Sequence, residues 1–412
     1  MKHKLLILPN YYYPDSGASS VIYTELCEDL VAYYNVTVVC TVPCYAGLVD
    51  KHYRKNKFYF EKQNEVSIIR VHVGNVDKAS KKSRIKNILL YYLRAKRYIK
   101  QVGNQDVVIA GTQPPILGGR LGVYAKKKTG GKSIYYIHDF NPEQAEFTGY
   151  VKNRFLLRFM KHLDKDSCKK ADMVVTSSAD MQKNLEERFC GTAIPKNIVI
   201  PNWVDLQKVK PISRQKNPLF TRFHLSKGNF YISYAGNIGI MQDFPTILKA
   251  AAILKDTCPA IQFVLIGSGV FKGEMDQTVK QKELTNVHLF PMQPTGEDSI
   301  LYSFGNVELI SIGKNVTKCS IPSKTCKIFA SGRPVLCQAD LKSALVKEIE
   351  SYNIGIGVQP GDAEAFANAA RNLYNNRNQL SQMGKNARIY AEHHFSRANA
   401  VEQFRQAVNN LI

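Results

Sequence analysis

One loop of the chain gathers side chains that could bind an anion. It lies between an apolar run at residues 307–312, which predicts a buried parallel strand, and a helical pattern predicted to begin at Pro322. Proline is tolerated in the first turn of a helix, because the N–H that it lacks would have no partner there. Four cationic and hydroxyl residues surround this point: Lys318, Ser320, Ser323 and Lys324. We expect the serines to cap the helix and the lysines to bring positive charge to its N-terminus.

A helix N-terminus with two cations beside it predicts a site for a phosphate or a diphosphate, since its free N–H groups and its dipole both favour negative charge. Arg333, just after the predicted helix, could supply a third cation. The same pattern also fits an ordinary strand–loop–helix unit with capped ends. The residues by themselves leave both interpretations open.

The run Pro322-Ser-Lys, followed by Phe-Ala-Ser-Gly-Arg-Pro-Val335, resembles the donor segment of glycosyltransferase family 4. These are retaining transferases of the GT-B fold that use nucleotide-diphosphate sugars. Most members carry two glutamates at the positions of Cys319 and Lys327, whereas a subgroup resembling surface-polysaccharide transferases of the fucosamine type has Pro-Ser-Lys, as here. The resemblance implies donor contacts from Lys318, Cys319, Ser320, Ile321, Pro322, Ser323, Lys324 and Lys327.

Two loops in the first half extend the resemblance. Gly17 and Ala18 follow the first predicted strand, where family 4 enzymes have a glycine-containing loop that faces the donor phosphates and the acceptor. Ala18 replaces the usual second glycine. His138 and Asp139, before an expected turn at Asn141-Pro142, resemble the segment whose histidine lies beside the donor sugar. The candidate catalytic residues are therefore His138, Asp139 and Lys324.

Two loops in the second half are similar to the family's phosphate and nucleobase loops. Asn237 and Gln242 stand where the family commonly has arginine and lysine, so the usual cationic clamp is missing and Lys318, Lys324 and Arg333 become its replacements. Asn237 and the amides near Gly239 could still donate hydrogen bonds. The expected donor contacts in these loops are Gly236, Asn237, Gly239, Gly267, Phe290 and Met292.

The strands and helices that must position these loops can be predicted from the pattern of apolar and polar residues along the chain. Strand-like apolar runs alternate with helical stretches in both halves, which predicts βαβ units and parallel sheets. A chain of 412 residues is too long for one core. The resemblance implies two Rossmann-like, doubly wound α/β domains that face each other across a cleft. We expect an acceptor-side domain at 1–205, a nucleotide-sugar domain at 206–385 that begins with a linker at 207–228, and one long final helix crossing back to the first domain at about 386–412.

The net charge of +22 predicts an anionic partner. Residues 78–100 carry nine Lys/Arg and no carboxylate, with apolar residues at helical spacing, and the basic segment 152–170 includes Phe155, Leu156 and Phe159. Part of each apolar stripe must pack on a sheet. The cationic faces also favour an anionic membrane surface, where each Lys or Arg contributes roughly 1 kcal/mol. Nucleic acid is the weaker alternative, because aromatic residues do not alternate with the basic ones.

Nine scattered cysteines lack metal-ligand spacing, so reduced thiols in a cytoplasm are expected and neither a metal nor a cofactor is. No run of apolar residues is long enough to span a bilayer. The chain is expected to lie on the inner face of the cytoplasmic membrane.

The combined interpretation is a retaining hexosyl- or N-acetylhexosaminyltransferase that uses a nucleotide-diphosphate sugar, most simply a UDP-sugar. Its acceptor would be a saccharide, lipid-linked, in the synthesis of lipopolysaccharide, capsule or another glycoconjugate. Two alternatives stay open: a nucleotide-sugar epimerase or hydrolase of the same fold, and an inactive or nucleic-acid-binding basic protein.

Overall fold

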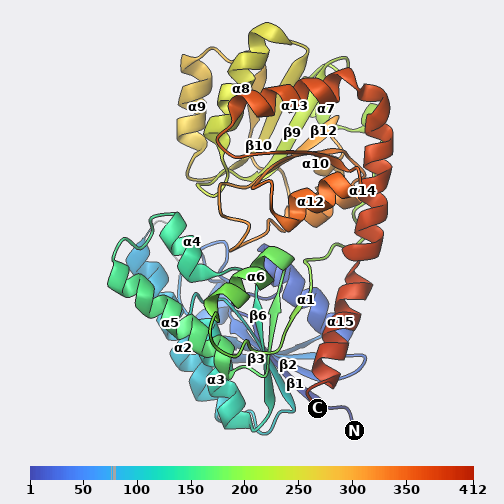
Figure 1. The fold of residues 1–412 in the computed structure, drawn as a ribbon. Coiled ribbons are helices and arrows are strands. Elements are labelled where there is room, and N and C mark those ends of the chain that lie inside the picture. The colour runs from blue at the N-terminus through green and yellow to red at the C-terminus, as the bar shows by residue number, and fades with distance from the viewer. Residues whose placement is uncertain (76, 78–79) are drawn as a thin grey trace. The chain divides into compact units, whose positions relative to one another are not determined.

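The computed structural model describes residues 1–75, 77 and 80–412, and the chain forms two compact units (Figure 1). The first comprises Met1–Pro201 and Ala400–Ile412, and the second comprises Asn202–Asn399. Each is a Rossmann-like α/β domain built on a sheet of mainly parallel strands, which confirms the predicted fold class. Lys78, the first cation of the predicted basic helix, lies outside the described residues.

The described sheet of the first unit has the order β3-β4-β2-β1-β5-β6-β7-β8. Its strands are β1 (Lys4–Leu8), β2 (Asn35–Thr41), β3 (Phe58–Gln63), β4 (Val66–Val71), β5 (Val107–Gly111), β6 (Lys132–Ile137), β7 (Met173–Thr176) and β8 (Asn197–Val199). The central strands are continuous apolar runs because both of their faces are covered. Strand β3 was not predicted, because it is an antiparallel edge strand whose Phe60 is exposed and whose Glu61 and Lys62 break the apolar run.

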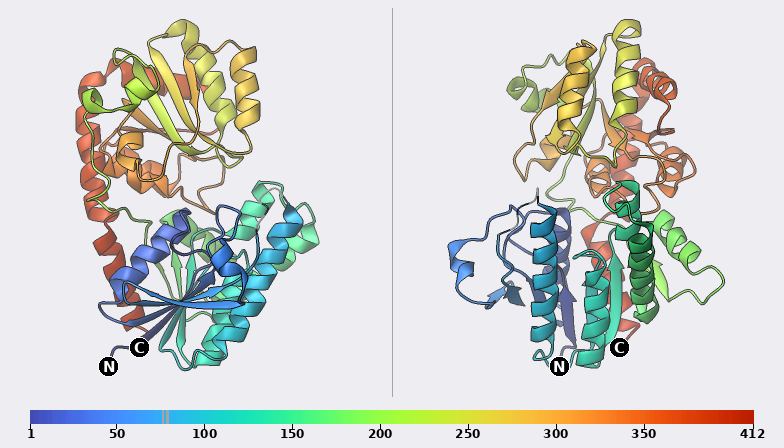
Figure 2. Two further views of the ribbon diagram at one scale, coloured as in Figure 1. Left: turned by 180° about the vertical axis from the view of Figure 1, so that it is seen from behind. Right: turned by 90° about the vertical axis from the view of Figure 1, so that its left-hand side faces the viewer.

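Helices cover the faces of this sheet. They are α1 (Ala18–Leu30), α2 (Lys81–Ile99), α3 (Leu117–Thr129), α4 (Asn141–Phe147), α5 (Arg154–Lys170) and α6 (Ala179–Arg188). Helix α3 contacts α2 on one side and α5 on the other (Figure 2). The turn expected at Asn141-Pro142 is wrong, because these residues open α4, with the proline in its first turn.

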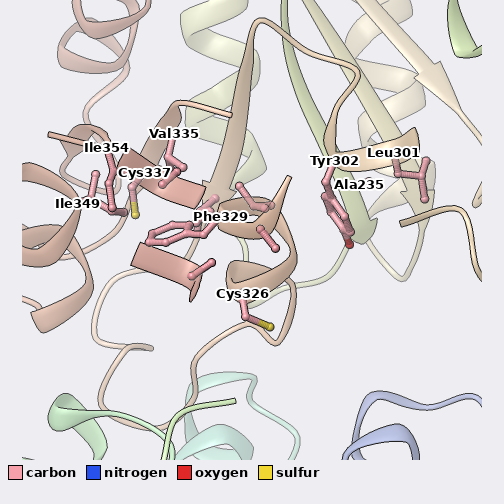
Figure 3. Packing of buried hydrophobic residues seen from close by; sticks show 14 of the residues in the cluster. Ala235, Leu301, Tyr302, Cys326, Phe329, Val335, Cys337, Ile349 and Ile354 are labelled. Atoms are coloured by element: carbon pink, nitrogen blue, oxygen red, sulfur yellow. The ribbon is translucent and has the colours of Figure 1, made fainter. Parts of the chain in front are cut away.

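The second unit contains a parallel sheet with the described order β11-β10-β9-β12-β13-β14. Its strands are β9 (Phe230–Asn237), β10 (Ile261–Ser268), β11 (Val287–Phe290), β12 (Val307–Ser311), β13 (Val335–Gln338) and β14 (Gly355–Val358). Strand order reverses between β9 and β12, and ligands of such sheets bind beyond the carboxyl ends of the strands at this reversal. Figure 3 shows the core beneath that point, where Cys326 and Phe329 pack in one cluster with Val335 and Cys337 of β13.

The helices of this unit correct two predictions. They are α7 (Leu219–Arg222), α8 (Phe244–Thr257), α9 (Lys272–Gln281), α10 (Asp298–Tyr302), α11 (Lys324–Ala330), α12 (Ala344–Ser351) and α13 (Ala363–Asn375). The stretch 207–228, predicted to be a linker with an approach segment, includes α7, whose Leu219 and Phe220 are buried in the core. The sequence pattern of residues 238–255 predicts a helix, but α8 begins only at Phe244, where the Asp243 side chain accepts a hydrogen bond from the Thr246 amide.

The predicted single final helix is wrong. The structure has α14 (Leu380–His394) and α15 (Arg397–Asn409), separated at Phe395-Ser396, where Ser396 forms a bridge with Val204. The residues from Ala400 onwards belong to the first unit, where Phe404 packs 5.0 Å from the ring of Tyr136. In the part of the chain that the structure describes, no helix is long and apolar enough to cross a membrane.

Candidate functional site

Lys324 places a cation at the reversal point of the second sheet. It is the first residue of α11, and its side chain reaches the carboxyl end of β9. The ammonium Nζ lies 3.1 Å from the ring centroid of Tyr234 and 3.4 Å from the carbonyl oxygen of Ala235. No described carboxylate forms an ion pair with it. A half-buried cation that forms no ion pair leaves the site complementary to an incoming anion.

A buried carboxyl group interacts electrostatically with this cation. Glu308 of β12 accepts hydrogen bonds from the Ser233 hydroxyl and from the Gly305 amide at 3.1 Å. Burial raises the pKa of Glu308 to about 8, and the nearby charges of Arg333 and Lys324 oppose that shift. Burial likewise holds the pKa of Lys324 well below its ordinary value, against the attraction of Glu308. A phosphate at Lys324 would add negative charge and raise that pKa.

The loop from β12 to α11 only partly follows the prediction. Helix α11 begins at Lys324, so Pro322 lies before the helix and not in its first turn. Ser323 is the N-cap residue, but its side chain makes no cap hydrogen bond, so the predicted serine cap is wrong there. The amides of Ser323 and Lys324 have no backbone or side-chain acceptor among the described residues, and both remain available to a ligand.

The other predicted donor contacts in this loop differ in how exposed they are. Cys319 is buried, with its Sγ 3.2 Å from the Val316 carbonyl oxygen, while Lys318 is exposed. The Ser320 amide donates to the same Val316 carbonyl oxygen at 3.0 Å. Ile321 is partly exposed. The loop is therefore a folded turn that presents its Lys318 side chain at the surface.

Two predicted donor-site cations, Lys327 as a donor contact and Arg333 as part of the diphosphate clamp, have other roles. The Lys327 ammonium pairs with the Asp298 carboxylate of α10 at 2.9 Å, so its charge is already balanced. The Arg333 guanidinium donates to the carbonyl oxygens of Ile212 and Ser303, at 2.7 and 2.8 Å. Arg333 precedes β13 and lies at the amino ends of the strands. The prediction that it joins the clamp is wrong, because Lys324 lies at their carboxyl ends.

The loop after β9 is tightly folded. Gly267 and Gly269 allow β10 to approach it, because a Cβ at Gly267 would lie 1.9 Å from the Gly236 carbonyl oxygen. The Gly239 amide donates to Gln242 Oε1 at 3.1 Å, so this amide is engaged within the loop rather than offered to a ligand. Gln242 thus orders the loop at the position where the family has a cation. Asn237 is exposed at the end of β9.

A polar network that the sequence analysis missed joins four strand ends. The Asp243 carboxylate accepts from Gln338 Nε2 at 3.1 Å and from the Gly361 amide at 2.7 Å. The Asp243 amide donates to the Ser311 hydroxyl, which in turn donates to Gln338 Oε1 at 2.8 Å. The signal that could have revealed it is a polar residue closing an apolar strand, as Ser311 closes β12 and Gln338 closes β13.

The predicted nucleobase contacts Phe290 and Met292 lie at the carboxyl end of β11, an edge strand of the described sheet. Phe290, the last residue of β11, stacks on Phe223 with ring centroids 3.8 Å apart, so its side chain belongs to the core. Only its backbone remains for a base. Met292, two residues further, is 48% exposed and can pack against a ligand.

In the first unit, Gly17 caps α1 and Ala18 is its first residue. A Cβ at Gly17 would stand 2.9 Å from the Tyr45 ring, so glycine permits that ring to approach. Asp15 fixes the same neighbourhood by accepting from the amides of Cys44 and Tyr45, at 3.1 and 2.9 Å. The loop is a preformed surface around the start of α1.

His138 follows β6 and packs among aromatic rings. Its ring centroid lies 3.9 Å from that of Tyr136 and 5.3 Å from that of Tyr23. Its Nε2 is buried and has no partner among the described residues. Burial lowers the pKa of His138 to about 3, so the imidazole is neutral near pH 7. A neutral imidazole with one open nitrogen can hydrogen-bond a sugar hydroxyl, but it is a poor proton donor.

The segment after His138 is fixed by a buried charge cluster. Asp139 accepts from Gln144 Nε2 at 2.8 Å, which folds the loop onto α4. Arg188 of α6 pairs with Glu143 of α4 and, at 2.7 Å, with Asp164 of α5. Breaking a buried pair typically costs about 3–5 kcal/mol, so this cluster holds the loop rigidly.

The titration of His138 gives a testable stability effect. Because its pKa is about 3 in the folded chain and about 6.5 when unfolded, the unfolded state binds more protons between these values. This group's contribution is complete above pH 6.5 and is lost as the pH falls towards 3. In a His138→Asn variant, we expect the free energy of unfolding to fall by about 1–2 kcal/mol less between pH 7.5 and pH 5 than in the wild type. Urea unfolding at both values measures this, with the exposed His162→Asn as control; equal pH dependence in all three proteins would contradict it.

Comparison with known proteins gives matches over both units. Residues 17–208 match the family model "Glycosyltransferase Family 4", and residues 216–390 match "Glycosyl transferases group 1". Two curated relatives carry provisional names. WbjE of Pseudomonas aeruginosa, "Probable glycosyltransferase", is 24% identical over 74% of this chain and 75% of its own. WcaI of Escherichia coli (strain K12), named as a colanic acid biosynthesis glycosyl transferase, is 25% identical over 68% of each chain.

A solved structure shares the fold. The Anabaena protein Alr3699/HepE, crystallised with UDP and glucose, superimposes with a TM-score of 0.72 at 15% identity, covering 99% of this chain and 100% of its own. The two family models together span both units, and the fold is that of GT-B enzymes. The chain is therefore a glycosyltransferase of the GT-B fold.

Proposed function

We propose that the chain transfers a sugar from a UDP-sugar to a saccharide acceptor in the synthesis of a cell-surface polysaccharide, with retention of the anomeric configuration. The observation that carries this proposal is the half-buried Lys324 side chain at the reversal point of the second sheet, whose ammonium forms no ion pair in the described chain. The name of WcaI supports a polysaccharide product, and the UDP complex of HepE supports the nucleotide.

The residues would divide the work as follows. Lys324 and the free amides of Ser323 and Lys324 would bind the diphosphate and stabilise the charge that develops as it leaves. Lys318, exposed on the same loop, would add a second cation. His138 would accept or donate a hydrogen bond to the sugar as a neutral imidazole. With these groups, the departing diphosphate can itself help to deprotonate the acceptor hydroxyl, and neither an enzyme nucleophile nor a metal is part of the proposal.

The acceptor is proposed to be lipid-linked, and the chain to bind the inner face of the cytoplasmic membrane. Large apolar residues are exposed on α2 (Ile85, Leu89, Leu93) and on α5 (Phe155, Leu156, Phe159), and we call this set the apolar–basic face. Exposed cations flank them on both helices, at Lys82, Lys86, Arg154 and Arg158. The Arg84 guanidinium stacks 5.2 Å from the ring centroid of Tyr150, which links α2 to the loop before α5. Such a surface matches an anionic bilayer.

Calorimetric titration with UDP, GDP, ADP and their sugars tests the donor. We expect saturable binding of UDP and of one UDP-sugar, and transfer to a saccharide acceptor that is unchanged by EDTA. Binding of GDP or ADP alone would overturn the assignment of the nucleotide. Rapid release of free sugar without any acceptor would favour the epimerase or hydrolase alternative instead.

A further inference from the structure

A cavity lined by cations opens at the amino ends of the strands of the second unit. It has a volume of about 590 Å³, within the range of small-molecule sites. Its wall includes Asn306 and Pro334, which stand immediately before β12 and β13, at the amino ends of these strands. Lys324 and the free amides of α11 lie at the carboxyl ends. The cavity is therefore separate from the proposed donor site.

Five cations line this cavity: Arg214, Arg333, Arg377, Lys385 and Arg388. Among the described residues, only Arg388 has a carboxylate partner, Glu392 at 2.7 Å. The Arg388 Nη1 group also donates to the carbonyl oxygens of Val209 and Ala330, which turns it towards the protein. The other four cations share one concave space and form no ion pair in the described chain, although the nearby Glu308 raises the pKa of Arg333 against the effect of burial. Burial lowers the pKa of Arg214 to about 10, and the charge of Arg333 adds to this shift.

The two innermost guanidinium groups are held in place by neutral acceptors. Arg214 donates to Asn306 Oδ1 at 2.7 Å and to the Asn229 carbonyl oxygen at 2.6 Å. Arg333 donates through Nη2 alone, to Ile212 and Ser303, and its buried Nε has no partner in the described chain. These bonds orient both groups without neutralising them. Guanidinium groups that are fixed in this way and form no ion pair suit a phosphoryl group, which they can bind with several N–H donors.

Apolar surface completes the cavity. Pro211, Leu380 and Ile389 stand beside the cations, so the cavity can cover an organic part as well as a charged one. The wall also joins the segment that enters the unit after Asn202 with the helix α14 that leads out of it. We propose that this cavity is a second ligand site, which binds a soluble phosphate-bearing small molecule independently of the donor.

Inorganic pyrophosphate is the probe, titrated calorimetrically into the full-length protein. The test variant is R377E/K385E, because both side chains are exposed at the cavity and neither has a carboxylate partner in the described chain. The control K249E/K347E makes the same change in net charge at exposed helix positions outside the cavity. We expect pyrophosphate binding at the cavity to weaken at least tenfold in the test variant and to be unchanged in the control.

Hydrogen exchange can distinguish pyrophosphate bound in this cavity from pyrophosphate bound at the donor site. In the wild type, pyrophosphate should slow exchange at residues 377–389, and the R377E/K385E variant should lose this protection while retaining any protection near Lys324. Equal affinity in all three proteins, or protection confined to the loop before α11, would overturn the proposal. Binding to phosphatidic acid vesicles that needs Arg377 and Lys385, with no effect of soluble pyrophosphate, would also overturn it in favour of a lipid headgroup.

Discussion

A Lys324→Ala variant is expected to bind the nucleotide-diphosphate sugar about a hundredfold more weakly than the wild type. The Lys324 side chain is half-buried at the end of β9, so its attraction to a diphosphate is screened less than that of a surface lysine. Truncating one partner of a buried charge pair costs about 2–5 kcal/mol, which corresponds to a loss of this size. Calorimetric titration with the UDP-sugar measures the dissociation constant directly.

Two further variants make this result specific. Lys324→Met keeps an aliphatic stem beside the Tyr234 ring and should show the same loss, which would assign the effect to charge rather than to packing. Lys347→Met removes an exposed lysine of α12 and should bind as the wild type does. Thermal unfolding of each variant checks that the fold is intact. A folded Lys324→Met variant with unchanged affinity would exclude this residue from the site.

The lowered pKa of Lys324 adds a signature that a merely structural lysine would lack. In the free protein, Lys324 loses its proton at a lower pH than an ordinary lysine does, because its pKa is lowered. A bound diphosphate favours the protonated form, so binding takes up a proton, and affinity falls as the pH rises through the Lys324 pKa of the free state. Titrations in two buffers with different heats of ionisation should reveal this uptake in the wild type and its loss in Lys324→Met.

The sequence predicted the sheets well because their central strands are short apolar runs bounded by polar loops. The sequence pattern predicts strands at 173–176 and 287–290 and a helix at 344–351, and these are the bounds of β7, β11 and α12, since composition changes sharply at both ends. β3 was not predicted because one face of an edge strand is solvated, and its charged residues give a sequence pattern typical of a loop. The break at Phe395-Ser396 escaped because neither residue is a helix breaker, and the chain there is fixed by the bridge to Val204.

The site was predictable only as far as local pattern reaches. Gly236, Asn237 and Lys324 were identified from loops after strands, and the structure brings them to one strand end. Arg333 was misplaced because adjacency along the chain does not say which edge of the sheet a residue occupies. Glu308 could not be recognised, since its role depends on a hydrogen bond with Ser233 across 75 residues of chain.

A Phe155→Asp variant is expected to lose at least tenfold in affinity for anionic vesicles. Phe155 is 81% exposed at the start of α5, within the apolar–basic face. Burying a phenylalanine in a bilayer contributes about 2–3 kcal/mol, and the new carboxylate is repelled by the acidic headgroups. Sedimentation with vesicles of phosphatidylcholine containing 30% phosphatidylglycerol measures the fraction bound.

The matched control is Ile194→Asp, which makes the same change in charge at an exposed apolar residue of the first unit outside α2 and α5. It should sediment as the wild type does. Lys86→Gln and Arg158→Gln should each weaken binding by several-fold at low salt and less at high salt, because ions screen the attraction between exposed cations and headgroups. Equal loss in Ile194→Asp would mean that net charge alone drives the binding. Unchanged binding of Phe155→Asp would mean that the apolar–basic face does not enter the bilayer, and the lipid-linked acceptor would then lose its main structural support.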